Sequence, residues 1–255
     1  MLRAISLKTV LLGGVVACAL AAPVSAQQRT NLIWIEPGHL DLAPIIGLPP
    51  AQNSPEAKAE LERVVTITTT RTPEREKAAI ADQYTTLNAF LEGMNHEFVS
   101  NTHRETRLLF REANIELGIV LLSVRRLTNR PRPFQVWSKV RVKPCPGGRP
   151  SGTSFPAGHT ATAALYAELL AQAAPELKEQ FEARVKEYGE SRLVCGFHYP
   201  SDLVAGDKAG RAVAKALLED KAFRTRFDDT VPEIREALGL KKSGSRAGAA
   251  SPRSG

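Results

Sequence analysis

The pattern of apolar and polar positions along the chain predicts helices. Apolar residues recur at helical spacing in the segments 83–98, 104–127, 159–174, 175–189 and 201–219. A period near 3.6 residues is the mark of helices with one buried face. One strand-like run, VVTITTT, has no second run to pair with. We therefore predict an all-α fold, a single-domain helical bundle.

Two helix starts precede these segments, at Ser54 and Thr72, each followed by a proline. A hydroxyl residue before proline is a common way to begin a helix. The run 64–70 between them, VVTITTT, is predicted to be a loop or a frayed helix end. The earlier segment 27–52 is rich in proline without a period and predicts an extended arm.

Two segments stand out within the predicted bundle. Residues 115–124, IELGIVLLSV, are apolar on nearly all sides, so we expect this helix at the centre. It ends ahead of Pro131 and Pro133, which cannot continue a helix. The following segment 135–155, dense in glycine, proline and lysine, predicts a long loop, and such loops are often functional.

The amino terminus has the pattern of a secretory signal peptide. Two positive charges precede an apolar run at 9–22, and small residues lead up to Ala26. We predict a signal peptide over 1–26, cleavage after Ala26, and a periplasmic or secreted protein. Lipoprotein anchoring at Cys18 is the second interpretation. No other apolar run reaches the roughly 20 residues of a membrane span, so we expect no integral membrane segment in the mature chain.

The net charge of +7 lies mostly at the two ends of the chain. The residues 27–240 carry 28 basic and 27 acidic side chains, whereas the tail 241–255 has four basic residues and no acidic one. A balanced body does not favour nucleic-acid binding, and we expect no nucleic-acid partner. We predict one domain over 27–240 and a disordered basic tail over 241–255. Homo-oligomerisation stays open.

Two cysteines remain after the predicted leader, Cys145 and Cys195. An even number of cysteines in an oxidising compartment favours a disulfide between them. That bridge would tie the loop KPCPGG to the segment SRLVCGFH.

Three loop-to-helix junctions carry the candidate chemistry: RRLTNRPRPF at 125–134, SFPAGHT at 154–160 and SRLVCGFHYPSD at 191–202. Their arginines are permanent cations whose planar forks match phosphate oxygens. A glycine at a helix start lets an anion approach backbone N–H groups. Histidines transfer protons or attack near neutral pH, and an aspartate can orient one. The candidates are Arg125, Arg132, Gly158 and Arg192 for anion binding, and His159, His198 and Asp202 for catalysis.

This combination resembles the type 2 phosphatidic acid phosphatase superfamily. The family signature is Lys-x6-Arg-Pro, then Pro-Ser-Gly-His, then Ser-Arg-x5-His-x3-Asp. The chain has Arg125-x6-Arg132-Pro133, then Pro156-Ala157-Gly158-His159, then Ser191-Arg192-x5-His198-x3-Asp202. The leader, the LPP arm and the lack of membrane spans are most similar to the secreted bacterial class A nonspecific acid phosphatases.

The resemblance implies a metal-independent acid phosphatase that uses no cofactor and hydrolyses small phosphomonoesters. His198 would attack phosphorus to form a phosphohistidine, and Asp202 would orient it. His159 would protonate the leaving alcohol, which implies an acidic optimum, and transfer of phosphate to alcohols stays open. The cluster of three arginines and the Gly158 N–H would hold the phosphate oxygens.

Two positions depart from the family pattern. Arg125 replaces lysine, which keeps the charge but changes its geometry. Ala157 replaces a serine that would contact the phosphate, while the backbone N–H groups of 157 and 158 would remain. Losing a hydrogen bond to a charged group costs about 1.5–3 kcal/mol, so we expect an active enzyme that is slower or more selective.

Other interpretations stay open. His159, His198 and Asp202 have the composition of a metal site, although three nearby arginines would repel a cation. A vanadate-dependent haloperoxidase and a non-catalytic phosphate-binding protein would use the same pocket. Side chains without partners at meaningful spacing are expected to be structural or solvated; these include Arg126, Arg130, His39, His96 and His103. Tyr199 and Phe155 would line a pocket or pack in the core.

Overall fold

The computed structural model describes residues 34–36, 38–98, 102–136, 141–147, 150 and 152–240. These residues form helices and no strand, which confirms the predicted all-α class. None of the helices within the described ranges has the length and apolar character needed to cross a bilayer. The predicted signal peptide and the predicted basic tail both lie outside the described residues.

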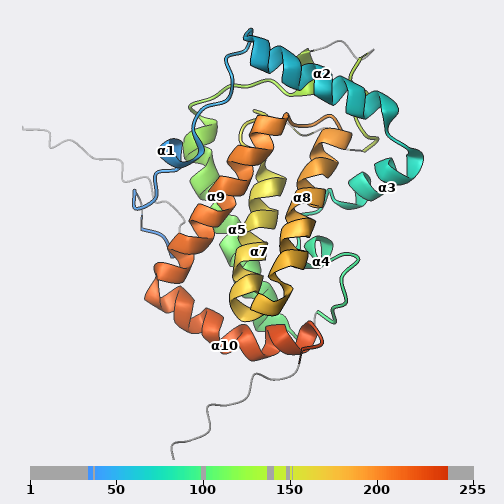
Figure 1. The fold of residues 1–255 in the computed structure, drawn as a ribbon. Helices are drawn as coiled ribbons and strands as arrows, with labels where there is room; N and C mark the ends of the chain where they lie inside the picture. The colour runs from blue at the N-terminus through green and yellow to red at the C-terminus, as the bar shows by residue number, and fades with distance from the viewer. Residues whose placement is uncertain are drawn as a thin grey trace, which may run out of the picture.

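The helices form a bundle around α7, Gly158–Ala173. Figure 1 shows α7 between α8 and α9, with α5 behind it, α10 across one end and α2 across the other. The long helices are α2 (Pro55–Thr70), α3 (Pro73–Ala81), α5 (Arg104–Arg125), α8 (Lys178–Val194), α9 (Pro200–Glu219) and α10 (Lys221–Ala237). The short ones are α1 (Ala43–Ile46), α4 (Leu87–Phe90), α6 (Pro133–Val136) and the 3-10 turn η1 (Pro175–Leu177).

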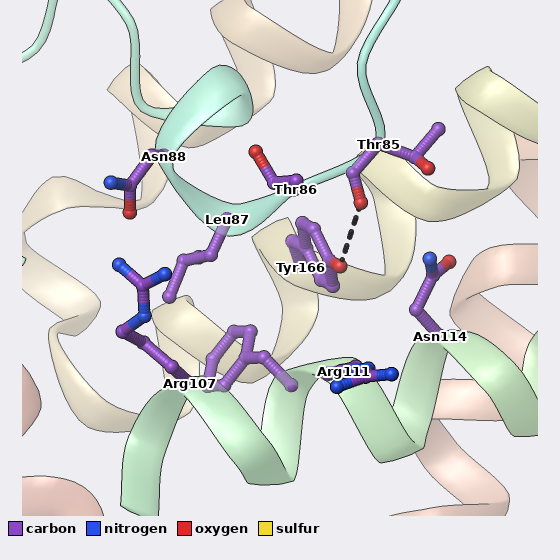
Figure 2. Close-up of a pocket in the computed structure, with 9 residues that line it drawn as sticks. Thr85, Thr86, Leu87, Asn88, Arg107, Arg111, Asn114 and Tyr166 are labelled. Atoms are coloured by element: carbon purple, nitrogen blue, oxygen red, sulfur yellow. Dashed lines mark hydrogen bonds between the residues drawn. The ribbon is translucent and has the colours of Figure 1, made fainter. Parts of the chain in front are cut away.

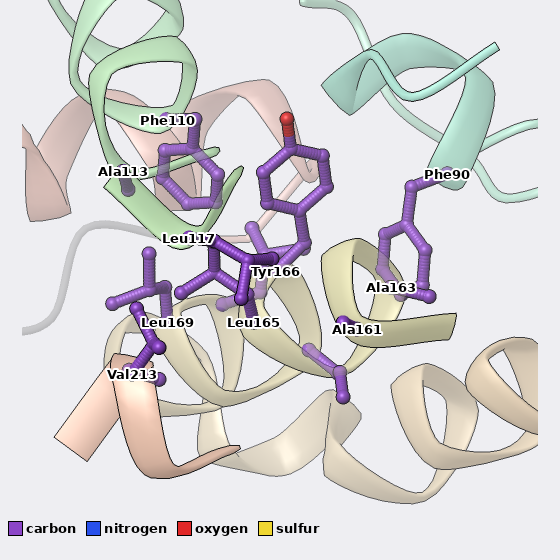
Figure 3. Packing of buried hydrophobic residues seen from close by; sticks show 14 of the residues in the cluster. Phe90, Phe110, Ala113, Leu117, Ala161, Ala163, Leu165, Tyr166, Leu169 and Val213 are labelled. Carbon is purple, nitrogen blue, oxygen red and sulfur yellow. The ribbon is translucent and has the colours of Figure 1, made fainter. Parts of the chain in front are cut away.

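The central helix is α7, and the expectation that 115–124 would be central is wrong. Ile115 and Leu122 in α5 are 46% and 47% exposed, so α5 buries only one side. The alanine-rich α7 is buried on nearly every side, because its small side chains let α5, α8, α9 and α10 all pack against it. Figure 3 shows Leu165 and Leu169 of α7 among side chains of α5 and α9.

Residues 64–70 are regular helix, which corrects the prediction of a loop or frayed end. Although β-branched residues are weak helix formers, the threonine hydroxyls bond to carbonyls of the preceding turn; Thr69 Oγ1 donates to Val65 O at 2.8 Å. Val64 and Thr68 are also buried, so tertiary packing outweighs the local preference.

The segment 83–98 is mostly turns, and the predicted long helix is reduced to α4. The helix stops after Phe90, and Gly93 adopts φ 81°, which no helix continues. Arg184 of α8 donates to the carbonyls of Phe90 and Ala89 and pairs with the buried Asp82. The carbonyls that a longer helix would have bonded are thus satisfied by a side chain.

The predicted helix 175–189 begins later and runs further. A 3-10 turn precedes it, and α8 continues to Val194. Tyr188, Ser191 and Arg192 are all buried, so this extension stays within the core of the bundle. As a result Arg192 belongs to the last turn of α8 rather than to a loop.

Helices α7 and α9 approach closely at two glycines, Gly206 and Gly210. A Cβ atom at Gly206 would overlap the carbonyl oxygen of Ala157, and one at Gly210 would overlap that of Ala161. Glycine at this spacing lets two helix backbones come nearer than any other residue would allow. The first turn of α7 is therefore held directly against α9.

Replacing Gly210 with alanine should destabilise the fold, because the backbone atoms of α7 cannot move aside as a flexible side chain could. We expect Gly210→Ala to lower the free energy of unfolding by at least about 2 kcal/mol. The matched control is Gly118→Ala in α5, where a Cβ meets open space. It should be neutral or stabilising by up to about 1 kcal/mol. Urea denaturation of both variants measures the difference, and equal stability would contradict the close packing.

Candidate active site

The spacing Arg-x5-His-x3-Asp is the spacing of a helix end followed directly by a helix start. Helix α8 ends in a Schellman motif, in which Phe197 N donates to Arg192 O at 3.0 Å and Gly196 N to Leu193 O at 2.9 Å. Helix α9 then begins, and Asp202 in its first turn accepts the Tyr199 N–H at 2.8 Å. The two caps fix the turn that carries His198.

A disulfide secures this turn. Cys145 and Cys195 are bonded, as predicted, and join the segment 141–147 to the end of α8. Gly196 has φ 66°, and a Cβ there would lie 2.7 Å from the side chain of Val142. Glycine is therefore required both by the left-handed conformation and by the close approach of the bridged loop.

His198 is buried and held in one tautomer. Its Nδ1–H donates to the carbonyl of Ser154 at 2.7 Å, and Asp202 Oδ2 lies 3.5 Å from the same nitrogen. Nε2 therefore carries the lone pair, and it faces Arg132 Nη1 at 3.0 Å. Burial and the charges of Arg132 and Arg192 lower the pKa of His198 despite Asp202. The result is a neutral imidazole whose Nε2 can attack an electrophile.

Asp202 is fully buried and anchored by a residue that the sequence did not single out. Arg130 donates to Asp202 Oδ1 at 2.6 Å and to Glu60 Oε2 at 2.6 Å, and its guanidinium lies over the Tyr199 ring at 3.9 Å. Glu60 also accepts the Ser201 N–H at the start of α9. Burial opposes the charge of Asp202, but the hydrogen bond to His198 and the nearby arginine keep its pKa below the ordinary value.

Arg130 is therefore ion-paired, in agreement with the expectation that it is a structural residue. It also contacts Asp202, a candidate catalytic residue. The only sequence signal was its place between Arg125 and Arg132 in RRLTNRPRPF. Glu60 lies 70 residues before Arg130 along the chain, and nothing in the sequence connects the two.

The amino terminus of α7 presents Gly158 to a guanidinium. Arg125 Nη2 lies 2.6 Å from the position that a Cβ of Gly158 would take, and among the described residues the Arg125 guanidinium has no hydrogen-bond or ion-pair partner. The first N–H groups of a helix are unpaired and favour an anion. The Ala157 N–H is not among them, contrary to expectation, because it donates to the carbonyl of Asp202 at 2.9 Å.

Three cations thus gather at one place. Arg132 and Arg192 are both buried, and burial lowers the pKa of each to about 10. Arg192 donates to the carbonyl of Ala79 at 2.8 Å, while its Nε is buried without a partner among the described residues. Burial also lowers the pKa of Arg125. Buried cations that lie close together repel one another, and a bound anion would offset this repulsion.

His159 lies one residue into α7 and faces the same charges. Its Nε2–H donates to the carbonyl of Gln83 at 2.9 Å, and its ring stacks on Tyr188. Burial and the positive charge of Arg192 lower the pKa of His159 to about 3, although the Gln83 carbonyl favours the protonated form. In the free protein His159 is therefore neutral at the pH values where a histidine usually titrates.

The remaining candidates are structural. Tyr199 packs with Leu61 and Val64 in a small core, and Phe155 is buried in the main core. His39 is exposed, while His96 and His103 contact the ring of Phe98. The donors of the metal alternative do not converge: His198 directs Nδ1 to a carbonyl and Nε2 to a guanidinium, so neither nitrogen is open to a metal.

The comparisons with known proteins agree with this site. Residues 116–226 match the family model of the PAP2 superfamily, and this match confirms the predicted resemblance. The matched segment contains Arg125, Arg132, Gly158, His159, Arg192, His198 and Asp202.

Several relatives are named non-specific acid phosphatase. The chain is 33% identical to that of Salmonella typhi over 123 residues, 48% of this chain and 47% of that protein. It is 25% identical to that of Providencia stuartii over 149 residues, 58% of this chain and 60% of that protein. The match thus spans about half the length of these curated relatives.

The chain also resembles a solved structure, that of a transmembrane PAP2 type phosphatidylglycerolphosphate phosphatase from Bacillus subtilis. It has 17% identity and a TM-score of 0.46, over 70% of this chain and 89% of that one.

Because His159 stays neutral in the folded protein, the stability of the fold should depend on pH. The unfolded chain protonates His159 below about pH 6.5, whereas the folded protein does so only near pH 3, so stability falls as the pH drops through this range. We expect the melting temperature to be lower at about pH 5 than at pH 7 by about 5 °C. Saturating sulfate should reduce this difference, because its charge offsets the arginines.

The variant His159→Asn keeps a polar amide at this position but cannot titrate. It should show a clearly smaller pH difference in melting temperature. The control His39→Asn removes an exposed histidine and should behave like the wild type. An unchanged pH dependence in His159→Asn would show that His159 does not carry this effect.

Proposed function

We propose that this protein is a secreted acid phosphatase that hydrolyses phosphate monoesters through a phosphohistidine on His198. The observation that carries the proposal is the gathering of Arg125, Arg132 and Arg192 around a buried neutral imidazole whose Nε2 lone pair faces Arg132. The acid phosphatase names of the relatives support it, and the leader-like amino terminus supports secretion.

Binding places the phosphate among these cations. The dianion would occupy the space between the three guanidinium groups and the first N–H groups of α7. Arg132 now bonds to His198 Nε2, and a phosphate oxygen would take over that N–H and release the lone pair. Burial strengthens each of these interactions because little water competes for the charges.

The first chemical step forms an N–P bond and breaks the P–O bond to the alcohol. His198 Nε2 attacks phosphorus while Nδ1–H stays on the Ser154 carbonyl, and Asp202 stabilises the positive charge that develops on the ring. The leaving oxygen takes a proton from His159, whose Nδ1 is the nitrogen open to protonation. In the second step a water molecule attacks phosphorus and gives its proton to His159, and the N–P bond breaks.

The acid role of His159 depends on the substrate. In the free protein its pKa is about 3 because of burial and Arg192. A bound dianion offsets that positive charge and raises the pKa of His159 in the complex. The substrate therefore brings about protonation of its own general acid, and an acidic optimum follows.

Hydrolysis of p-nitrophenyl phosphate tests the proposal. Between about pH 4 and 8, with a chelator present, the wild type should be active at the acid end. The variant His198→Ala should lose at least about a thousandfold in kcat. The control His39→Ala, which removes an exposed histidine, should keep wild-type activity.

Three outcomes would contradict the proposal. They are the absence of hydrolysis by a folded wild type, abolition of activity by the chelator, and an active His198→Ala variant. If an inactive wild type oxidises bromide when vanadate is added, the pocket serves haloperoxidase chemistry instead. If the protein binds sulfate but catalyses neither reaction, the protein is a non-catalytic phosphate-binding relative.

A further inference from the structure

A second concave site lies beside α7, between α5 and the segment 85–88. It is a cavity of about 210 Å³. The residues that line it are Thr85, Thr86, Leu87, Asn88, Arg107, Phe110, Arg111, Asn114 and Tyr166. Two of them are arginines and none is acidic, so the pocket has a positive charge, and its hydroxyl and amide groups can serve as further hydrogen-bond donors.

The two arginines are placed to bind an anion together. Arg107 and Arg111 are four residues apart and hence neighbours on one face of α5. Neither guanidinium has a hydrogen-bond or ion-pair partner among the described residues. Figure 2 shows Arg107 beside Leu87 and Asn88 at one end of the pocket, and Asn114 at the opposite end. Two like charges on neighbouring turns repel unless an anion lies between them.

The floor of the pocket is aromatic. The rings of Phe110 and Tyr166 lie 5.5 Å apart, and both side chains are buried. The Tyr166 hydroxyl is directed to the carbonyl of Thr85 at 3.1 Å, as Figure 2 shows. Binding pockets commonly combine such an apolar floor with a few polar groups that fix orientation.

The pocket and the candidate active site lie along the same face of α7. His159, Thr162 and Tyr166 are spaced three and four residues apart, so they share one face of the helix. From His159 to Tyr166 the helix rises by about 10 Å. Thr162 donates to Asn114 at 2.7 Å, which brings the near end of the pocket within one turn of His159.

The same chain segment borders both places. The carbonyl of Gln83 accepts the His159 N–H, and Thr85 and Thr86, two and three residues further along the chain, line the pocket. His159 is the group that would protonate the leaving alcohol. The leaving group of a bound monoester would therefore depart on the side of α7 that leads to Arg107 and Arg111.

We propose that this pocket binds a second anionic group on the leaving-group side of the substrate. Resting on the proposed function, the inference assigns a substrate class: phosphomonoesters whose alcohol carries another phosphate or carboxylate about 10 Å or more from the reacting phosphorus. Arg107 and Arg111 bind that group, and Phe110 and Tyr166 contact the body between the two anions.

A series of synthetic substrates of different length tests this assignment. The α,ω-bisphosphates of hexanediol and decanediol are compared with decyl monophosphate, which lacks the second anion. The wild type should prefer decanediol bisphosphate in kcat/KM. In the double variant Arg107→Gln/Arg111→Gln, the ratio of kcat/KM for this bisphosphate over the monophosphate should fall by about tenfold or more. An unchanged ratio would overturn the inference.

The matched control is Arg104→Gln, which removes an exposed arginine of the same helix outside the pocket. It should leave the ratio unchanged, and a fall equal to that of the double variant would mean that only the overall charge of α5 matters. Because exposed charge is screened by salt, the wild-type preference should also shrink as ionic strength rises.

Binding without turnover separates this inference from the proposed function. In the His198→Ala background, decanediol bisphosphate should bind more tightly than decyl monophosphate by calorimetry, and Arg107→Gln/Arg111→Gln should remove the difference. This result supports binding of a second anion in the pocket even if the wild type hydrolyses none of the compounds. Equal binding of the two compounds before the arginines are changed would overturn the inference, even if the enzyme is an active phosphatase.

Discussion

The structure depends on positive charge that is buried around two neutral histidines. Arg125, Arg132 and Arg192 meet beside His198. Two acids lie near them: Asp202 is ion-paired with Arg130, and Asp82 is ion-paired with Arg184. Such an arrangement lowers the stability of the free protein and makes the site selective for anions. It also holds His159 and His198 neutral, so binding of an anion and protonation of His159 are linked.

Rigid local geometry at the ends of three helices holds these charged groups in place. The Schellman turn after α8 and the cap of α9 fix His198 between Arg192 and Asp202. Gly206 and Gly210 hold the first turn of α7 against α9. His159, Arg192 and Asp202 thus lie at helix ends whose positions are set by backbone contacts, which keeps the site in place.

The sequence predicted the helical class, the disulfide and the residues that meet at the site, because these follow from short-range patterns. The prediction of secondary structure from the sequence failed where long-range packing determines the conformation. VVTITTT is helical because Val64 and Thr68 are buried, and 83–98 is mostly turns because Arg184 satisfies its carbonyls. The partners that orient His198 and Asp202, the Ser154 carbonyl and the pair Arg130–Glu60, come from distant segments that no spacing connects.

The linkage between anion binding and the charge of His159 is tested most directly by calorimetry. Sulfate, which stays a dianion, is titrated into the protein at about pH 6 in buffers of different ionisation enthalpy. We predict net proton uptake by the wild type on binding and almost none by His159→Asn. Sulfate binding without proton uptake in the wild type would contradict the claim that a bound anion favours protonation of His159.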